Sequence, residues 1–161
     1  MSSTDVTRES ATWAAPPPKP GEMKLEVIQV PVSDIDRAKE FYASLGWRED
    51  ADFDISEDLR IVQFTPPGSG CSIGFGKGLT TMKPGSVQRM ELAVHDVVAA
   101  REDLISRGVE VDEIYHSAPG EEPGPGPHPE RKSYASYASF SDPDGNSWLM
   151  QEVSERLPGR G

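Results

Sequence analysis

The stretch RMELAVHDVVAAREDLISRGVEV, residues 89–111, can be laid over VIQVPVSDIDRAKEFYASLGWRE, residues 27–49, at a constant offset of 62 residues. In both copies a β-branched stretch precedes an aspartate suited to cap a helix, a helical pattern with an apolar face, and a glycine suited to end the helix. The identical pairs are Val32/Val94, Asp34/Asp96, Ala38/Ala100, Glu40/Glu102, Ser44/Ser106 and Gly46/Gly108. Because these matches fall on positions with different physical roles, they favour an internal duplication.

Three short strand candidates follow the helix in each copy. They are WREDADF (47–53), RIVQFTP (60–66) and CSIGFG (71–76) in the first copy, and VDEIY (111–115), YASYASF (134–140) and SWLMQEV (147–153) in the second. We therefore predict an α+β fold of two β-α-β-β-β modules, called unit one and unit two below. The sheet of one such unit leaves an apolar face uncovered, so we expect the two curved mixed sheets to surround a ligand cleft.

One domain is predicted, with a tail at each end. The domain spans residues 23–153, with unit one at about 23–77, unit two at about 87–153, and a proline- and glycine-rich loop insert at about 115–134. Residues 1–22 are proline-rich and polar, which predicts a disordered N-terminal tail, and residues 154–161 are expected to form a C-terminal tail.

Composition excludes several classes of function. The net charge of −11 repels phosphate backbones, which argues against nucleic acid as a partner. No apolar run approaches the roughly 20 residues needed to cross a bilayer, and the N-terminus lacks the pattern of a secretory signal. Cys71 is the only cysteine, so no internal disulfide can form. We expect a cytoplasmic protein with no membrane partner.

The acidic segment DPDGN (142–146) resembles the start of a calcium loop but fails its spacing. Its glycine stands at the fourth position rather than the sixth, and the twelfth position is Val153. We predict a hairpin turn in which Gly145 adopts a positive φ. By strand alternation, Trp148 should then face a helix and Leu149 the opposite side of the sheet.

Three segments together resemble the vicinal oxygen chelate superfamily, the glyoxalase I, bleomycin-resistance and extradiol dioxygenase group. They are VPVSDIDRAKEFYASLGW, ELAVHDVVAAREDLISRGV and FSDPDGNSWLMQEV, and the resemblance covers nearly all of residues 23–153. That fold hosts isomerases, dioxygenases, transferases and drug-binding proteins, so it implies a small-molecule ligand without naming a reaction. Dimers are frequent in the superfamily, which implies a homodimer. Pairing of the units within one chain and pairing between two chains both stay open.

The resemblance also implies where a divalent metal would bind. Metal-dependent members use four side chains, from the first and last strands of each unit. Counted from the shared landmarks, these positions fall on Val27, Gly74, Arg89 and Leu149. None of these four side chains can ligate a cation, because valine and leucine have no lone pairs, glycine has no side chain and arginine stays protonated. We therefore expect no metal cofactor. The alternative is a displaced set of Gln29, Glu91, Gln151 and a loop histidine such as His116.

Four polar residues are the main site candidates, since alternation places them on the face of the four metal positions. They are Gln29, Arg89, Glu91 and Gln151. Arg89 either holds a carboxylate or phenolate of a ligand or only pairs with Glu91. If Glu91 is partly buried its pKa would rise, which makes it the best candidate general base. His116 lies in the loop insert and is either part of a lid over the cleft or solvated.

The sequence thus favours a metal-free protein of the bleomycin-resistance type. It would bind or transform an apolar or aromatic metabolite or antibiotic, with Val27, Gly74, Leu149 and the polar candidates lining the cleft. The alternative is a divalent-metal-dependent enzyme, either a glyoxalase-like lyase or isomerase or a dioxygenase, that uses the displaced ligand set.

Overall fold

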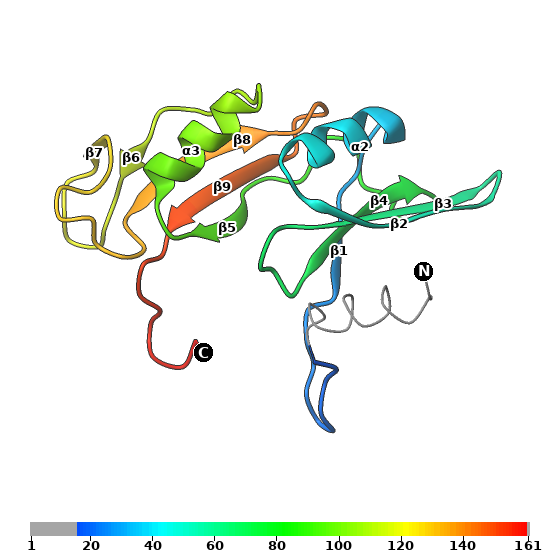
Figure 1. Cartoon of the computed structure of the whole chain (residues 1–161), viewed down its shortest axis with the longest axis horizontal. Coiled ribbons are helices and arrows are strands. Elements are labelled where there is room, and N and C mark those ends of the chain that lie inside the picture. Colours follow the sequence, from blue (N-terminus) through cyan, green and yellow to red (C-terminus); the bar gives the residue numbers. More distant parts are fainter. Residues whose placement is uncertain (1–15, 161) are drawn as a thin grey trace, which may run out of the picture.

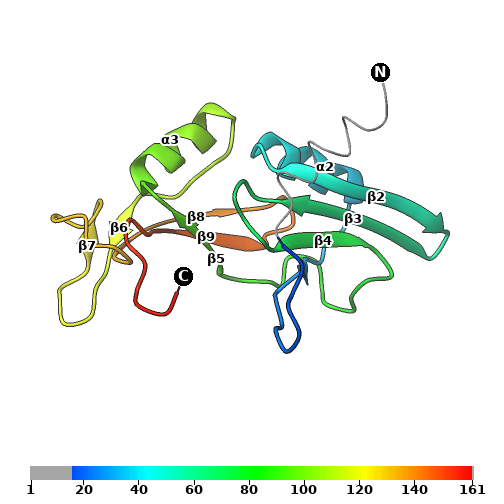
Figure 2. The same cartoon turned by 60° about the horizontal axis from the view of Figure 1, so that its bottom comes forward.

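The computed structural model describes residues 16–160, which form two mixed β-sheets with one helix packed on each. Figures 1 and 2 show both helices on the same side of the two sheets. Unit one contains β1 (Val27–Gln29), α2 (Ile35–Ser44), β2 (Arg48–Ser56), β3 (Leu59–Thr65) and β4 (Ser72–Lys77), with strand order β1-β4-β3-β2. The first strand pairs in parallel with the last, as a β-α-β-β-β unit requires.

Unit two repeats this arrangement and adds short strands at its outer edge. It contains β5 (Met90–Val94), α3 (Val97–Ser106), β6 (Tyr115–His116), β7 (Gly124–Pro125), β8 (Ser136–Ser141) and β9 (Ser147–Glu152), with strand order β5-β9-β8-β6-β7. Here too the first strand pairs in parallel with the last. The predicted α+β duplication is confirmed.

Both predicted helix starts are confirmed by their capping bonds. The carboxylate of Asp34 accepts a hydrogen bond from the backbone N–H of Arg37, and that of Asp96 accepts from Val98 and Ala99. These bonds satisfy donors that have no partner inside the helix. At the other ends, Gly46 and Gly108 have φ values of 83° and 88°, a backbone that glycine adopts without steric cost.

The strand predicted at VDEIY (111–115) is wrong for all but its last residue, since strand β6 begins only at Tyr115. The side chain of Arg101, on α3, donates hydrogen bonds to the backbone carbonyls of Val111 (3.2 Å) and Asp112 (2.9 Å). Those carbonyls are therefore taken by a guanidinium instead of a neighbouring strand. Unit two accordingly lacks the long hairpin that β2 and β3 form in unit one.

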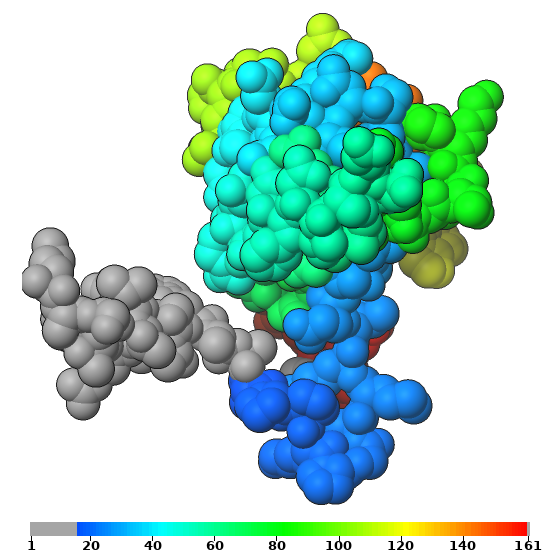
Figure 3. All heavy atoms as spheres, turned by 90° about the vertical axis from the view of Figure 1, so that its right-hand side faces the viewer, coloured from blue at the N-terminus to red at the C-terminus, as the bar shows by residue number. Residues whose placement is uncertain are grey.

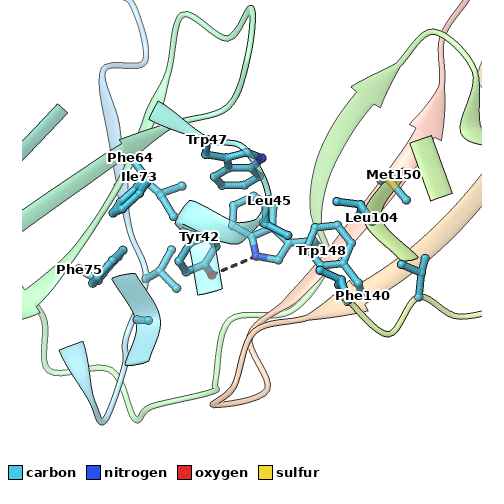
Figure 4. Packing of buried hydrophobic residues seen from close by; sticks show 14 of the residues in the cluster. Tyr42, Leu45, Trp47, Phe64, Ile73, Phe75, Leu104, Phe140, Trp148 and Met150 are labelled. Atoms are coloured by element: carbon cyan, nitrogen blue, oxygen red, sulfur yellow. Dashed lines mark hydrogen bonds between the residues drawn. The ribbon is translucent and has the colours of Figure 1, made fainter. Parts of the chain in front are cut away.

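A single hydrophobic core on the helix side joins the two units. Trp47 of unit one and Trp148 of unit two meet edge to face, with ring centroids 5.0 Å apart. The indole N–H of Trp148 donates to the hydroxyl of Tyr42 over 3.1 Å (Figure 4), and that hydroxyl donates to Asp142 over 2.9 Å. Burial, with the nearby Asp142 charge, raises the pKa of Tyr42 far above its usual range, so this hydroxyl stays protonated. Trp148 faces a helix, as predicted.

The DPDGN segment is the hairpin turn between β8 and β9, and it also fastens the two units together. Gly145 has a φ of 100°, as predicted, and one carboxylate oxygen of Asp142 accepts from the three backbone N–H groups of residues 144–146. The buried amide of Asn146 donates to the carbonyl of Pro31 in unit one (2.8 Å) and to Asp142 (2.8 Å). The turn therefore sets both the register of β9 and the contact with unit one.

The expected cleft is not formed within a single chain, because the two sheets do not close on each other. Each sheet turns one side toward its helix and the shared core, and leaves the other side without a helix (Figures 1 and 2). Burying two tryptophans and Tyr42 between the units fixes the sheets side by side, so their helix-free sides do not face one another.

The described residues near both ends of the chain, 16–26 and 153–160, extend away from the sheets. Residues 1–15 of the predicted disordered tail lie outside the described residues, and residues 16–26 project from the body as an arm (Figure 3, blue). Met23 and Leu25 of this arm are 99% and 71% exposed. Within residues 16–160, no helix is long and apolar enough to span a membrane.

Candidate ligand-binding faces

The candidate site residues lie on the sides of the sheets that carry no helix, called the free faces below. Alternation defines these faces, because one set of strand residues packs in the helix-side core and the set between them points away. The free face of the first sheet carries Val27, Gln29, Ile61, Gln63, Gly74 and Gly76, and that of the second sheet carries Glu91, Ala93, Tyr137, Ser139, Ser147, Leu149 and Gln151.

The positions of the superfamily's metal ligands map onto these faces, except for Arg89. Val27 and Gly74 lie on the first sheet, and Leu149 lies on the second, where it is 2% exposed and pairs with Glu91. Arg89 precedes β5 with a left-handed φ of 64°, so strand alternation does not extend to it. Its side chain is exposed, and its backbone N–H donates to Ser147 over 2.8 Å.

The residues at these positions do not fit a divalent cation. Their side chains offer no lone pair, and one of them carries a positive charge. Within residues 16–160, no group of three or more histidine, cysteine, aspartate or glutamate side chains is placed to hold a metal ion. The displaced set contains only one carboxylate, Glu91, and its Gln29 lies on the other sheet.

The polar candidates differ in how their side chains are satisfied. The amide of Gln151 donates to the carbonyl of Tyr134 and to the hydroxyl of Tyr137, both at 3.1 Å. The side-chain oxygen of Gln29 is buried and has no hydrogen-bond partner. Glu91 is exposed, so one chain does not supply the burial that favours a general base. In the described part of the chain no ion pair joins Arg89 to Glu91. The alternative in which Arg89 only pairs with Glu91 is therefore wrong for a single chain.

His116 lies apart from the free faces. It pairs with Ser136 on β8, a residue of the helix-side set, whereas its neighbour Tyr115 stacks on Tyr137 of the free face with ring centroids 5.2 Å apart. Because carbonyls only accept, its 3.0 Å contact with the carbonyl of Gly126 puts the ring proton on Nδ1. The ring lines a cavity of about 350 Å³, together with Glu121, Glu122, His128, Pro129 and Glu130.

A second cavity, of about 230 Å³, lies on the helix side where the units meet. Its wall is mostly apolar, and its lining includes Trp47, Pro66, Pro67, Leu92, Leu104, Phe140 and Met150. It adjoins the shared core and is separate from the free faces.

Sequence reasoning missed one buried acid, Glu152 at the end of β9. Its carboxylate caps α3 by accepting from the backbone N–H of Val97 (3.0 Å) and forms an ion pair with Arg131 (2.5 Å). The hydrogen bond from Arg131 lowers the pKa of Glu152, with a further contribution from the Val97 N–H. Arg131 also pairs with Asp96, the helix cap, so these three residues tie the loop insert to α3.

Comparison with known proteins agrees with this architecture. The family model of the Glyoxalase/Bleomycin resistance protein/Dioxygenase superfamily matches residues 24–150. The chain belongs to this superfamily. The match spans both units of the chain.

Several solved structures of this superfamily are similar to the chain. TnmS3, an antibiotic binding protein from Streptomyces sp. CB03234, is 32% identical with a TM-score of 0.65, over 83% of this chain and 98% of that one. A glyoxalase/bleomycin resistance protein from the same organism is 33% identical with a TM-score of 0.61, over 80% of this chain and 100% of that one. A superfamily member from Sphaerobacter thermophilus DSM 20745 is 26% identical with a TM-score of 0.61, over 81% and 98%. Comparison with curated proteins gave no match.

Proposed function

We propose that the protein binds an apolar or aromatic metabolite or antibiotic on its free faces, without the divalent metal used by many members of its superfamily. The observation that carries the proposal is the chemistry of the four metal positions, which hold Val27, Gly74, Arg89 and Leu149. Apolar side chains and a glycine supply no metal ligand at these positions. Because Leu149 is itself 2% exposed, the apolar surface open to a ligand lies around Val27 and Gly76 of the first sheet.

Similarity to TnmS3 supports the same class of ligand. That protein is described as antibiotic binding, and it is 32% identical to this chain over 98% of its own length. We propose only the class of compound that this chain binds. Small differences in the lining of a pocket change which molecule a binding protein accepts.

A thermal-shift screen of aromatic metabolites and antibiotics tests the proposal, with protein kept in excess chelator. We expect at least one compound to raise the melting temperature, because a ligand that binds only the folded state stabilises it. Gly74→Phe should abolish that shift by placing a ring on the free face, whereas Gly70→Phe, at an exposed turn with open space around it, should keep it. Binding that requires an added divalent ion would contradict the proposal.

We also propose that a second copy of the chain completes the site. One chain leaves the two free faces apart, and a homodimer would set the free face of unit one against that of unit two of the partner. The exposed apolar residues Phe53 and Ile55 on the β2–β3 hairpin, 59% and 58% exposed, support an interface in this region. Light scattering should give the mass of a dimer, and a monomer at micromolar concentration would contradict this part of the proposal.

If the bound compound is transformed, Glu91 is the residue we propose as the base. It is the carboxylate on the free face of the second sheet, and a partner that covers this face would supply the burial that one chain lacks. Glu91→Gln should then abolish turnover and leave binding intact.

A further inference from the structure

Gln29 presents an unusual feature on the free face of the first sheet. Among the described residues, its side-chain oxygen Oε1 is the buried side-chain polar atom that has no hydrogen-bond partner. A buried acceptor without a donor destabilises the folded state, so such atoms are uncommon. Within residues 16–160 no hydrogen bond holds the side-chain N–H₂ of Gln29 either, so the amide is not fixed in place by polar contacts.

The amide of Gln29 lies against Gly74. A Cβ atom built on Gly74 would come within 3.0 Å of Oε1 and 3.1 Å of Nε2 of Gln29. The absence of a side chain at position 74 is therefore what allows the amide to lie flat on the sheet. Because the amide is the end of a flexible side chain, rotation about its side-chain torsions can lift it from this slot.

The surroundings of this amide define what could bind beside it. Gly74 lies between two glutamines, since its strand partners are Gln29 on β1 and Gln63 on β3. Val27 precedes Gln29 on the same face, and Ile61 pairs with Gly76. The face is thus apolar and flat around the glycines, with amide groups on both sides of the slot.

We propose that Gln29 makes the site selective for ligands that carry a hydrogen-bond donor, a phenolic or alcoholic hydroxyl or an N–H, at the edge of an apolar body. This inference rests on the proposed binding function and names its ligand class more closely. Once the amide turns out of its slot, a donor on the ligand satisfies Oε1, which has no donor in the free protein, whereas a ligand without a donor leaves the oxygen unpaired. The apolar body then lies over Gly74 and Gly76. One neutral hydrogen bond of this kind changes affinity by about five- to tenfold.

A matched pair of probes tests the inference. 2-Naphthol and 2-methoxynaphthalene have the same ring system, but only the first can donate a hydrogen bond. Each is titrated into the ¹⁵N-labelled full chain, and the amide signals of Gly74 and Gly76 report both the location and the dissociation constant. The titrations are repeated with Gln29→Leu, Gln63→Leu and Gln88→Leu, the last being a surface control.

The expected result is that both probes shift the two glycine signals and that 2-naphthol binds about five- to tenfold more tightly to the natural chain and to Gln88→Leu. In Gln29→Leu the two probes should bind equally, with 2-methoxynaphthalene unaffected or bound more tightly. This pattern separates loss of a hydrogen bond from general damage to the face, which would weaken both probes.

Two results would overturn the inference and leave the proposed function standing. They are equal binding of both probes to the free face of the natural chain, and a preference for 2-naphthol that survives in Gln29→Leu but is lost in Gln63→Leu. If neither probe shifts any amide of either free face, the proposed binding of aromatic compounds is itself contradicted, and the inference with it.

Discussion

The β3–β4 hairpin of unit one and the β8–β9 hairpin of unit two occupy equivalent places in the duplication but make different contacts. The turn at residues 66–70 is closed by a backbone bond from Ser69 to Pro66 and is mostly exposed. The turn at residues 142–146 buries Asp142 and Asn146 and bonds to Tyr42 and Pro31 of the other unit. The duplicated scaffold therefore keeps its helix caps and glycine stops, while residues at its turns have become specialised for joining the units.

The free faces of the two units differ in a similar way. On unit two, the amide of Gln151 is held by Tyr134 and Tyr137. On unit one, the amide of Gln29 rests on Gly74 with its oxygen unsatisfied. The hydrogen bonds of Gln151 hold its amide in place, whereas the buried oxygen of Gln29 can pair with a ligand once the amide turns out of its slot. In the proposed binding mode, unit one therefore supplies the polar recognition through Gln29, and unit two supplies a face on which the amide of Gln151 is already held.

Asp142→Ala should have the largest effect on stability, because it removes the acceptor that joins the units. The hydroxyl of Tyr42 and the backbone N–H groups of the turn would lose this acceptor, and Asn146 would keep only its bond to Pro31, which costs on the order of 3–5 kcal/mol of unfolding free energy. Urea denaturation measures it. Ser69→Ala, at the equivalent turn of unit one, should change the unfolding free energy by less than about 1 kcal/mol. Similar losses in both variants would remove the difference between the two hairpins.

Glu152→Gln should produce a smaller, pH-dependent loss that is specific to unit two. The pKa of Glu152 is lowered in the folded chain by its bond with Arg131, so its contribution is fully present above the ordinary value of 4.5. That contribution is lost as the pH falls through the folded pKa. We expect the variant to lose about 2 kcal/mol at pH 7, and the gap to the natural chain to narrow by pH 3.

Denaturation curves at several pH values measure this gap. Glu57→Gln, at an exposed position on the hairpin of unit one, is the control and should show no such gap at any pH. A gap of constant size for Glu152→Gln between pH 7 and pH 3 would show that the charge of Glu152 does not stabilise α3.

Gly74→Ala should have the smallest effect on stability and tests whether the amide of Gln29 is free to move. The new methyl group would lie 3.0 Å from that amide, which can turn away, so we expect a change within about 1 kcal/mol. The same change at Gly70, where nothing lies within 4 Å, is the matched control. A crystal structure of Gly74→Ala should show Gln29 lifted from the slot. A loss above about 2 kcal/mol would mean that the amide is fixed by its surroundings.

Local sequence signals predicted the parts of the fold that depend on neighbouring residues. The helix bounds were predicted from Asp34, Asp96 and the glycines Gly46 and Gly108, because a cap contacts only residues three or four positions away. The glycine of DPDGN gave the turn and hence the register that separates Trp148 from Leu149. The free-face positions of Leu149 and Gln151 followed from that register, whereas the alternation predicted for Arg89 was wrong because this residue precedes β5 with a left-handed φ.

The remaining features depend on contacts between residues far apart in the chain, which no local pattern reports. Asp142 is buried because Tyr42, 100 residues earlier, donates to it. Glu152, on the strand next to β5, caps α3 at Val97, and Arg101 bonds the carbonyls of Val111 and Asp112 where a strand was predicted. The side-by-side placement of the sheets likewise follows from how Trp47 and Trp148 pack.

Metal quantification on protein purified without a tag or chelator is the most direct test of the central claim, that the free faces bind a small molecule without a divalent ion. The residues at positions 27, 74, 89 and 149 predict no stoichiometric metal in the isolated protein. One tightly bound divalent ion per site would contradict the account.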